Sequence, residues 1–365
     1  MDVLATTTLG LEAIAIREIH ELTGRTAVVA HRGMVRCSVD EADIFTLNYC
    51  AKSLHHVLLL CTECTFSTLE ELYQQTRAID FARLIHPAQS FAVRPKRIGT
   101  HDFTSEDIGR VVGQAVIDGY EAEQKVRLKV NLDQPHVIIR AEARHDRFWI
   151  SLDTTGDDSL HKRGYRTYQH TAPLKPSIAY SLVRLAGWEA TETLLDPMCG
   201  SGTICIEAGL WANGVPNWFR QNYALWNLHF LDRRHFLDLK RAIDARVLRK
   251  RRAIRGCDLV EKHVRGAREN ADAAGVELEF FTGDATSIPL NADRIITNPP
   301  YGLRVARRGS IQELYRAFLA NLDLHEWTRT VILTGQPDLI PEDRVAERVD
   351  IMYGDLPASI LILAQ

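Results

Sequence analysis

The sequence lacks the two glycine patterns that mark the commonest nucleotide-binding loops. Neither GxGxxG, which binds dinucleotides, nor GxxxxGKS, which cradles the phosphates of nucleoside triphosphates, occurs in its 365 residues. Hydride transfer and nucleoside triphosphate hydrolysis therefore lose their usual support. No apolar run approaches the roughly 18 residues that a membrane-spanning helix needs, so we expect no membrane association.

The chain also lacks an excess of either charge. Its 44 Lys and Arg residues against 47 Asp and Glu residues give a net charge of -3, so any surface for a polyanion must be a local patch. The 7 cysteines are scattered and no signal peptide precedes them, which favours a cytoplasmic protein. Cys61 and Cys64 form a lone CxxC with no second pair at ligand spacing, so we expect buried thiols and no metal.

A chain of 365 residues is long enough for two or three domains. Residues 1–60 predict a small α+β unit, with a helical pattern that ends at Gly24 and strand-like segments around Gly33. Residues 61–155 predict a second α+β unit. Its expected helices cover 69–79 and 105–120, and its expected strands cover 91–97, 137–143 and 148–152.

The remaining residues, 156–365, alternate strand and helix patterns. The five strand candidates are 194–196, 253–257, 277–281, 294–297 and 330–333, and two more, 349–352 and 359–363, are close enough to pair as an antiparallel edge. This alternation predicts an α/β fold with a doubly wound, mostly parallel sheet. Ligands of such sheets bind beyond the carboxyl ends of the strands, where Asp196, Asp258, Asp284 and Asn298 fall.

A loop of small residues follows the first of these strands. It runs from Asp196 and Pro197 through Gly200, Ser201 and Gly202 to Thr203, where a helical pattern begins. Glycines let backbone amides approach a ligand closely, and a helix N-terminus adds unpaired N–H donors. The loop therefore predicts a site for a ligand with a carboxylate or phosphate.

The segment NPPYG, residues 298–302, predicts the reaction type. Two prolines fix φ twice and keep Asn298 out of helical geometry, so a rigid loop follows the strand. The carboxamide oxygen of Asn298 and the carbonyl of Pro299 are acceptors beside the aromatic face of Tyr301. Two acceptors and a ring suit a planar amine, and we therefore predict that these three residues are catalytic.

One long segment between the first two strands of the sheet is strongly basic. Residues 241–255 hold seven Lys and Arg residues against a single acid, Asp244, in a chain whose net charge is negative. A solvated helix face is seldom so lopsided, and we interpret the segment as a phosphate-contacting patch. A shorter basic run, Arg94 to Arg97, is weaker evidence because short runs often form a solvated edge.

Several phrases resemble a THUMP domain joined to a methyltransferase. They are Phe103-Thr104-Ser105, the helix through Gly113, Val130-Asn131-Leu132 with Pro135, and the junction LHKRGYR at 160–166. The resemblance implies a ferredoxin-like domain at 1–60, a THUMP domain at 61–155, a Rossmann-like class I methyltransferase at 156–365, and tRNA, bound by its acceptor stem and 3' end, as partner. The candidate RNA contacts are Arg94, Lys96, Arg97, Lys162, Arg163, Arg166, Arg249, Lys250, Arg251, Arg304 and Arg307.

The strand-end residues resemble those of class I methyltransferases that use S-adenosylmethionine and methylate amino groups. The resemblance implies these cofactor-binding residues: Asp196, Pro197, Gly200, Ser201, Gly202, Thr203, Asp258, Asp284, Ala285 and Asn298. About 60 residues separate Asp196 from Asp258, where about 20 are usual, and the basic insertion accounts for the difference. Glu207 is an alternative ribose-binding acid, but it falls inside the following helix.

Over nearly the full chain, the sequence resembles tRNA guanine-N2 methyltransferases that act at position 6 of the acceptor stem, and we expect a monomer. Enzymes acting at position 10 usually carry DPPYG, which Asn298 does not match, and rRNA guanine-N2 methyltransferases have a related organisation. DNA adenine-N6 and protein glutamine-N5 methyltransferases share NPPY but call for no THUMP domain. An inactive RNA-binding scaffold is disfavoured because the acids and NPPYG are intact.

Overall fold

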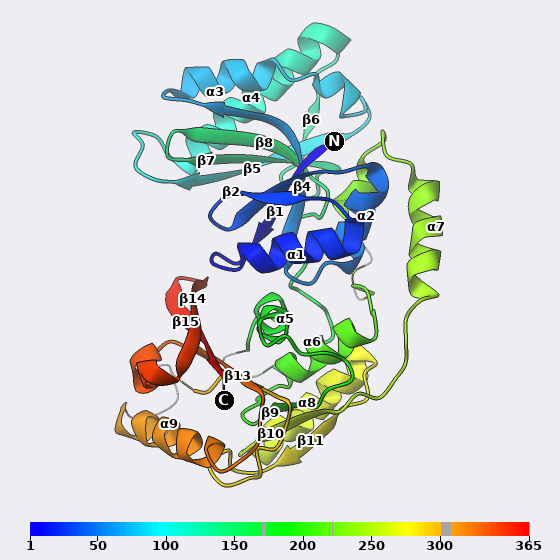
Figure 1. Ribbon diagram of the computed structural model, residues 1–365. Coiled ribbons are helices and arrows are strands. Elements are labelled where there is room, and N and C mark those ends of the chain that lie inside the picture. The colour runs from blue at the N-terminus through cyan, green and yellow to red at the C-terminus, as the bar shows by residue number, and fades with distance from the viewer. Residues whose placement is uncertain (170–172, 219, 221, 301–307, 365) are drawn as a thin grey trace.

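The computed structural model describes every residue except 170–172, 219, 221, 301–307 and 365 (Figure 1). The chain forms two bodies, each built around one sheet, with the N-terminal body at the top of Figure 1. No helix among the described residues is both long and apolar enough to cross a membrane.

The N-terminal body contains one continuous eight-stranded sheet in the order β2-β3-β1-β4-β8-β7-β5-β6. Its strands are β1 (Asp2–Thr7), β2 (Ala27–His31), β3 (Met34–Ser38), β4 (Leu54–Thr65), β5 (Ser90–Ile98), β6 (Lys129–Val130), β7 (Val137–Arg144) and β8 (Arg147–Asp153). The long strand β4 pairs with β1 over its first half and with β8 over its second half. The boundary we predicted near residue 60 therefore falls inside a strand that both α+β units share.

Helices cover one face of this sheet. They are α1 (Glu12–Thr23), α2 (Glu41–Cys50), α3 (Leu69–Arg77), the short 3-10 helix η1 (Phe81–Arg83) and α4 (Ser105–Gln124). Helix α4 begins at a capping box, in which Thr104 and Asp107 each accept a hydrogen bond from the other's backbone N–H. Phe45, Phe91 and Phe148 lie in the core between helices and sheet, and a smaller apolar cluster on the opposite face holds Trp149.

The second body contains a seven-stranded sheet in the order β11-β10-β9-β12-β13-β15-β14. Its strands are β9 (Leu194–Asp196), β10 (Ile254–Asp258), β11 (Glu279–Thr282), β12 (Arg294–Thr297), β13 (Arg329–Thr334), β14 (Val345–Tyr353) and β15 (Leu356–Ala364). The first five strands run parallel, and β15 and β14 pair antiparallel to complete one edge. The predicted doubly wound sheet and its antiparallel edge are confirmed.

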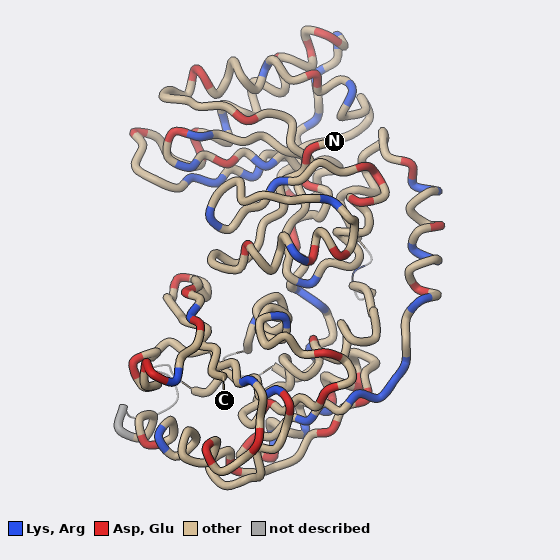
Figure 2. Tube along the Cα trace, in the orientation of Figure 1, with Lys and Arg blue, Asp and Glu red and all other residues tan. Residues whose placement is uncertain are grey.

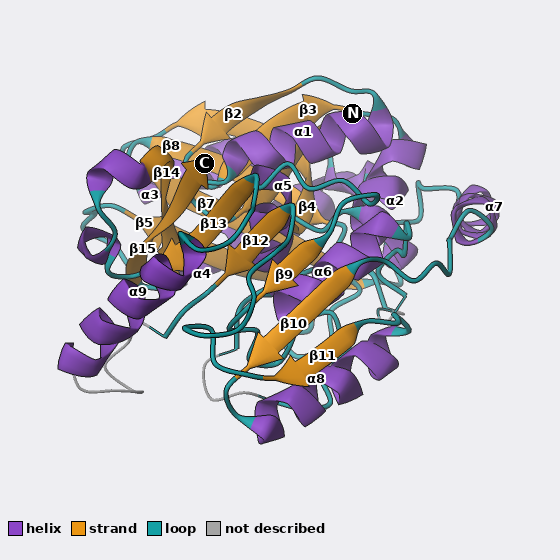
Figure 3. Cartoon of the chain, turned by 60° about the horizontal axis from the view of Figure 1, so that its bottom comes forward, coloured by secondary structure: helices purple, strands orange, loops and turns teal. Residues whose placement is uncertain are grey.

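Helices lie on both faces of the second sheet (Figure 3). They are α5 (Pro176–Leu185), α6 (Thr203–Ala212), α8 (Glu261–Ala274) and α9 (Arg308–Leu322), with the short 3-10 helices η3 (Pro337–Leu339) and η4 (Glu342–Arg344). Residues of α5, α6 and α8 share one apolar core, and residues of α9 lie in a separate one. This arrangement leaves the carboxyl edge of the parallel strands for a ligand.

The long insertion between α6 and β10 crosses to the N-terminal body. It forms η2 (Ala224–Asn227) and α7 (Arg233–Asp244), and Figure 1 shows α7 beside α2 of the N-terminal body. Leu225 and Phe236 are buried in the core of that sheet, and Asp244 accepts hydrogen bonds from Tyr49 at 2.7 Å and from the Trp218 indole at 2.8 Å. The insertion therefore packs against the N-terminal body and holds the two bodies together. Its basic composition did not predict this role.

Candidate active site

The loop after β9 has a backbone that only glycine accommodates well. Gly200 and Gly202 have φ angles of 53° and 78°, in the left-handed region. A Cβ atom on Gly202 would lie 2.9 Å from the ring of Phe280, closer than packed carbon atoms approach. Thr203 then opens α6, so the first N–H groups of that helix face the loop, as the sequence predicts.

The carboxylate of Asp258 ties this loop to the end of β10. Its Oδ2 accepts the backbone N–H of Gly200 at 2.9 Å, and its Oδ1 accepts the N–H of Val260 at 2.9 Å and lies 3.2 Å from His263 Nδ1. A carboxylate has about four lone-pair positions. One position on Oδ2 therefore remains for a ligand hydroxyl.

Asp196, at the end of β9, is a buried acid, and its side chain has no ion-pair partner among the described residues. Its Oδ1 accepts hydrogen bonds from Thr297 Oγ1 at 3.0 Å and from the Met198 N–H at 3.2 Å. Burial nevertheless raises the pKa of Asp196 to about 7, because removal from water penalises the carboxylate. A positively charged ligand in this loop would stabilise the ionised form.

Asp284 lies in the loop after β11 and is exposed. Its Oδ1 accepts hydrogen bonds from the N–H of Thr286 at 2.9 Å and from its hydroxyl at 2.7 Å, which fixes the side chain. The next residue, Ala285, is buried, and its carbonyl accepts a hydrogen bond from Asn321 at 3.0 Å. The loop is thus held from both sides, with the acid at its surface.

Asn298 follows β12 with a polar atom that the protein itself leaves unsatisfied. Its Oδ1 is buried and has no hydrogen-bond partner among the described residues, a costly state unless a ligand donates to it. Pro299 beside it is buried. Tyr301, Arg304 and Arg307, which we predicted to act at this loop, lie outside the described residues.

Three of these residues lie on adjacent strands at the carboxyl edge of the sheet. The strands β10, β9 and β12 are neighbours, and Gly256 of β10 pairs with Asp196 of β9. The Thr297 hydroxyl links the NPPY loop to the loop after β9. Asp258, Asp196 and Asn298 therefore line a common edge, as their positions after strands predict.

The described residues suit S-adenosylmethionine. Its amino and sulfonium groups are cationic, and Asp196 is a buried acid that lacks a cation among the described side chains. Its ribose hydroxyls match the remaining acceptor position of Asp258, and the glycine loop admits its carboxylate to backbone N–H groups. Glu207 does not compete as a ribose acid, because Arg163 and Tyr165 occupy its buried carboxylate.

The predicted RNA contact at Arg163 is wrong. The side chain is 1% exposed and pairs with Glu207 at 3.3 Å, while its other nitrogen donates to the Lys52 carbonyl at 2.7 Å. Arg163 therefore joins the junction segment and α6 to the N-terminal body, and no phosphate can reach it. Arg166 is also used internally, since its guanidinium donates to the Leu174 carbonyl and lies 3.4 Å from Thr203 Oγ1.

The other candidates on the N-terminal side are more accessible, and three of the four have acidic partners. Arg94 forms a two-pronged pair with Asp157 at 2.9 and 2.8 Å. Lys96 pairs with Glu142 at 3.2 Å and Lys162 with Asp158 at 2.5 Å, each about 60% exposed. Arg97 donates to the Gly99 carbonyl at 3.0 Å. Contacts of these four residues with RNA stay predictions.

The basic segment lies at the other edge of the sheet. Arg249, Lys250 and Arg251 are exposed and precede β10, so they lie at the amino edge, whereas Asp258 ends the same strand at the carboxyl edge. Figure 2 shows this run of basic residues along the chain between α7 and the second sheet. A phosphate bound there would be remote from Asn298, and the RNA contact stays a prediction.

The structure adds residues that our sequence reasoning did not single out. Asn270 is 1% exposed on α8; it donates to the Ser201 carbonyl at 3.1 Å and accepts the Tyr168 N–H at 2.9 Å. It thus ties the cofactor loop to the segment after the LHKRGYR junction. A polar residue inside the apolar stripe of α8 was the available signal. For Thr297 and Phe280, the sequence contained no pattern that would have indicated a role at the site.

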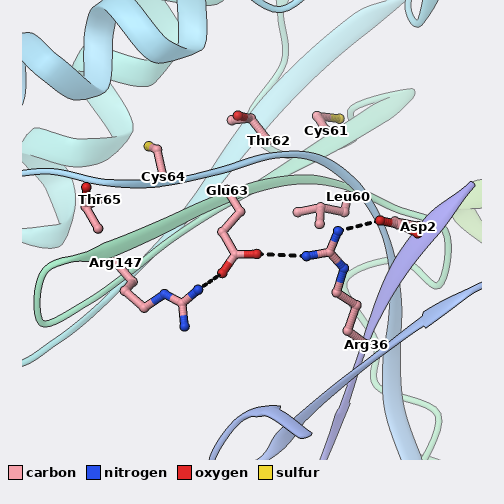
Figure 4. A pocket seen from close by; sticks show the side chains of 9 residues that line it. All are labelled: Asp2, Arg36, Leu60, Cys61, Thr62, Glu63, Cys64, Thr65 and Arg147. Atoms are coloured by element: carbon pink, nitrogen blue, oxygen red, sulfur yellow. Dashed lines mark hydrogen bonds and ion pairs between the residues drawn. The ribbon is translucent and has the colours of Figure 1, made fainter. Parts of the chain in front are cut away.

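The CxxC strand lines a separate cavity of about 530 Å³ on the N-terminal body (Figure 4). Glu63 lies between Arg147 and Arg36 and pairs with both, so the polar groups of the cavity satisfy one another. Burial raises the pKa of Cys61 to about 12, and that of Cys64 is also raised. Both cysteines are free and only partly buried, whereas the sequence predicts buried thiols. Among the described residues, no cluster of three or more metal-ligating side chains occurs.

Three family descriptions match successive parts of the chain. Residues 2–58 match the RlmL ferredoxin-like domain, residues 66–153 the THUMP domain, and residues 163–350 the RMKL-like, methyltransferase domain. A solved structure of a possible methylase from Clostridium difficile has a TM-score of 0.90 at 27% identity and covers 100% of this chain and 97% of that chain.

Curated relatives extend over most of the chain. A tRNA (guanine(6)-N2)-methyltransferase of Archaeoglobus fulgidus is 40% identical over 91% of this chain and 82% of its own length. One of Methanocaldococcus jannaschii is 37% identical over 100% of both chains. A ribosomal RNA large subunit methyltransferase K/L of Vibrio parahaemolyticus is 27% identical over 86% of this chain and 46% of its own length. The chain therefore belongs to the THUMP-containing, RMKL-like methyltransferase family and is an S-adenosylmethionine-dependent methyltransferase.

Proposed function

We propose that the enzyme transfers a methyl group to the exocyclic N2 of a guanosine in tRNA, at position 6 of the acceptor stem. The observation that carries this proposal is the buried acceptor Oδ1 of Asn298, which has no partner among the described residues and directly follows β12 at the carboxyl edge of the sheet. The two archaeal relatives, similar over most of this chain, bear the name of that activity.

In this proposal, residues at different strand ends hold different parts of the cofactor. Asp196, Pro197 and the loop Gly200–Thr203 hold the methionine portion, Asp258 accepts from the ribose, and Asp284 with Ala285 contacts the adenine. S-adenosylmethionine, when bound, supplies a methyl group made electrophilic by its sulfonium. The residues of the chain then need to align and desolvate the target rather than to supply a strong base.

Asn298 and Pro299 orient the target amine. The Asn298 carboxamide oxygen and the Pro299 carbonyl accept its two N–H groups, which turns the nitrogen lone pair toward the methyl group. Both acceptors are neutral and hold the amine without taking its proton. As the N2–CH3 bond forms, the bond between the methyl group and sulfur breaks, and the proton of the methylated amine is released to water. A rigid Pro-Pro loop keeps these acceptors fixed, so little reorganisation accompanies the reaction.

The guanosine must leave its stacked position to reach this pocket, because the N2 atom of a paired base lies inside the duplex. The THUMP-containing body, held to the catalytic body by the insertion and by Arg163, captures the acceptor stem and 3' end while the base is flipped. We propose action as a monomer in the cytoplasm, where free thiols such as Cys61 stay reduced.

A second candidate, methylation of a guanine in ribosomal RNA, is favoured by the relative from Vibrio parahaemolyticus. Incubation of the enzyme with labelled S-adenosylmethionine and either bulk tRNA or large-subunit rRNA separates the two. Our proposal expects label in tRNA, recovered after digestion to nucleosides as guanosine carrying one or two methyl groups on N2. Label confined to rRNA, or recovered in a nucleoside methylated at another atom, would reject it.

A further inference from the structure

A second cavity, of about 420 Å³, lies between the N-terminal body and the edge of the catalytic sheet. Both bodies line it: Leu9 and Arg32 come from the N-terminal body, and Gly335, Arg348, Asp350 and Ser359 come from the catalytic body. Most of the lining is apolar, and its charged groups are two arginines and one aspartate. We call it the interbody cleft.

The interbody cleft begins beside the catalytic edge. Gly335 immediately follows β13, which pairs with β12, and Thr297 of β12 lies opposite Ile332. Given a strand spacing of about 4.8 Å and a rise of about 3.3 Å per residue, Gly335 is within roughly 10 Å of Asn298. From there the cleft runs across β15 and β14 toward Arg32.

Close contacts fix the two walls of the cleft relative to each other. The Met352 N–H donates to the Leu9 carbonyl at 3.3 Å, which joins β14 to the N-terminal body. At Gly10, with φ of 94°, a Cβ atom would overlap the backbone carbonyl of Asp350. Only glycine permits so close an approach, so the geometry of the cleft is set before a ligand arrives.

Arg32 is held at the tip of a braced turn. Its backbone carbonyl accepts a hydrogen bond from the buried Arg144 guanidinium at 2.7 Å, and the Gly33 N–H donates to Glu12 at 2.5 Å. The Arg32 guanidinium itself has no hydrogen-bond or ion-pair partner among the described residues, and the side chain is exposed. A positive group on a fixed backbone is thus available to an anion.

Arg348 supplies the second positive charge from the opposite wall. It is 48% exposed and pairs with Asp350 at 2.8 Å, and Asp350 also accepts a hydrogen bond from Ser359 at 2.7 Å. The Ser359 hydroxyl and the Arg348 guanidinium hold the pKa of Asp350 below its usual value, so it stays ionised. The cleft therefore presents a net positive charge over an apolar floor.

We propose that the interbody cleft binds the nucleotide next to the flipped guanosine, with Arg32 contacting its phosphate. This inference rests on the proposed RNA methyltransferase function. Charge complementarity favours a phosphate, and the apolar floor suits an unstacked base. The near end of the cleft, at Gly335, is within roughly 10 Å of Asn298, which is compatible with a neighbouring nucleotide. Arg32 is then a positioning residue, which joins the N-terminal body to the reaction through the substrate.

The test compares Arg32→Ala with Arg17→Ala, a matched control on α1 whose arginine is 57% exposed and pairs with Glu21. We measure tRNA affinity over a range of salt concentrations, kcat and KM, S-adenosylmethionine affinity and Tm. For Arg32→Ala we expect about a tenfold rise in Kd and KM for tRNA, a salt slope lowered by about 0.7 to 1, and unchanged kcat, cofactor affinity and Tm.

A substrate change identifies the contact. The second substrate is a tRNA in which the phosphates flanking the target guanosine are uncharged methylphosphonates. The native enzyme and Arg17→Ala should bind this tRNA about tenfold more weakly than unmodified tRNA, whereas Arg32→Ala should bind both tRNAs equally. Equal losses in all three proteins, or an unchanged salt slope for Arg32→Ala, would overturn the proposal. The measurements of tRNA affinity and salt slope do not require methyl transfer. Failure to methylate position 6 would therefore reject the proposed function, whereas the binding results test the RNA contact at Arg32.

Discussion

The carboxylate of Asp258 accepts the backbone N–H of Gly200 at 2.9 Å and thereby joins the ends of two strands that the long insertion separates in sequence. The insertion leaves this geometry intact because it departs from the amino side of β10 and packs on the N-terminal body. The unusual spacing between Asp196 and Asp258 is thus absorbed away from the cofactor site.

Replacement of Asp258 should separate cofactor binding from RNA binding. Asp258→Ala leaves the Gly200 N–H without its acceptor and removes the proposed ribose contact, so we expect affinity for S-adenosylmethionine to fall at least tenfold. Isothermal titration calorimetry measures it, and tRNA affinity should stay within twofold. Glu261→Ala, at the exposed start of α8, is the control; native cofactor affinity in Asp258→Ala would remove the acid from the site.

Asp196 should make cofactor binding depend on pH. Its pKa of about 7 in the ligand-free protein means that the carboxyl is largely neutral below pH 7 and ionised above it. Because the ligand is cationic, its affinity should rise as the pH passes from 6 to 8. In Asp196→Asn the affinity should be weak and this rise should be absent. A rise of the same size in the variant would assign the titration to another group.

The same acid should lower the stability of the ligand-free protein at high pH. The folded chain holds the Asp196 proton up to about pH 7, whereas an unfolded Asp loses it near pH 4, so the unfolding free energy falls as the pH rises between these values. Asp196→Asn keeps an acceptor for Thr297 and removes this loss. We expect a Tm a few degrees above native at pH 8, and no difference near pH 4. A lower Tm at pH 8 would contradict this.

The hydrogen bonds to Asp244 should stabilise the packing of the insertion on the N-terminal body. Asp244→Ala removes the acceptor of Tyr49 and Trp218, which we expect to cost about 2 kcal/mol and lower Tm by about 4 to 8 °C. Arg241→Ala on the same helix, where the arginine is 79% exposed, should change Tm by less than about 1 °C. Equal Tm values for the two variants would show that these hydrogen bonds do not stabilise the packing of the insertion on the N-terminal body.

Strand ends are the most informative part of the sequence for locating the site. A parallel strand must be followed by a loop at the carboxyl edge, so an acid or Asn after each apolar run can be placed there from sequence alone. Asp196, Asp258 and Asn298 lie at that edge, and β14 and β15 form the antiparallel pair that their short connection predicts.

Charge patterns are less informative, because a side chain's sign does not say what it faces. Arg163 is in a basic phrase typical of a surface, yet the fold brings it against Glu207, 44 residues away, in the interior. The first half of the insertion is likewise a packing element, since its apolar residues complete a core to which distant strands contribute. Both outcomes depend on long-range contacts that local periodicity does not encode.

Asn298 should be required for transfer and dispensable for binding. Asn298→Ala removes the buried acceptor, and we expect kcat to fall at least a hundredfold while affinities for tRNA and cofactor stay within about threefold. Single-turnover methylation with equilibrium binding separates the two effects. Pro341→Ala, in a surface loop, is the control for a substitution outside the site and should keep the native rate. A variant that retains more than half of the native rate would refute the role of Asn298.

The central claim concerns one atom, and it can be tested by deleting that atom from the substrate. Inosine at position 6 of a tRNA transcript lacks only the exocyclic amine of guanosine. We expect the native enzyme to transfer one or more methyl groups to the guanosine-6 transcript, mapped to that nucleotide by mass spectrometry of nuclease fragments, and none to the inosine-6 transcript at equal affinity. Undiminished transfer to the inosine transcript would contradict the proposed target.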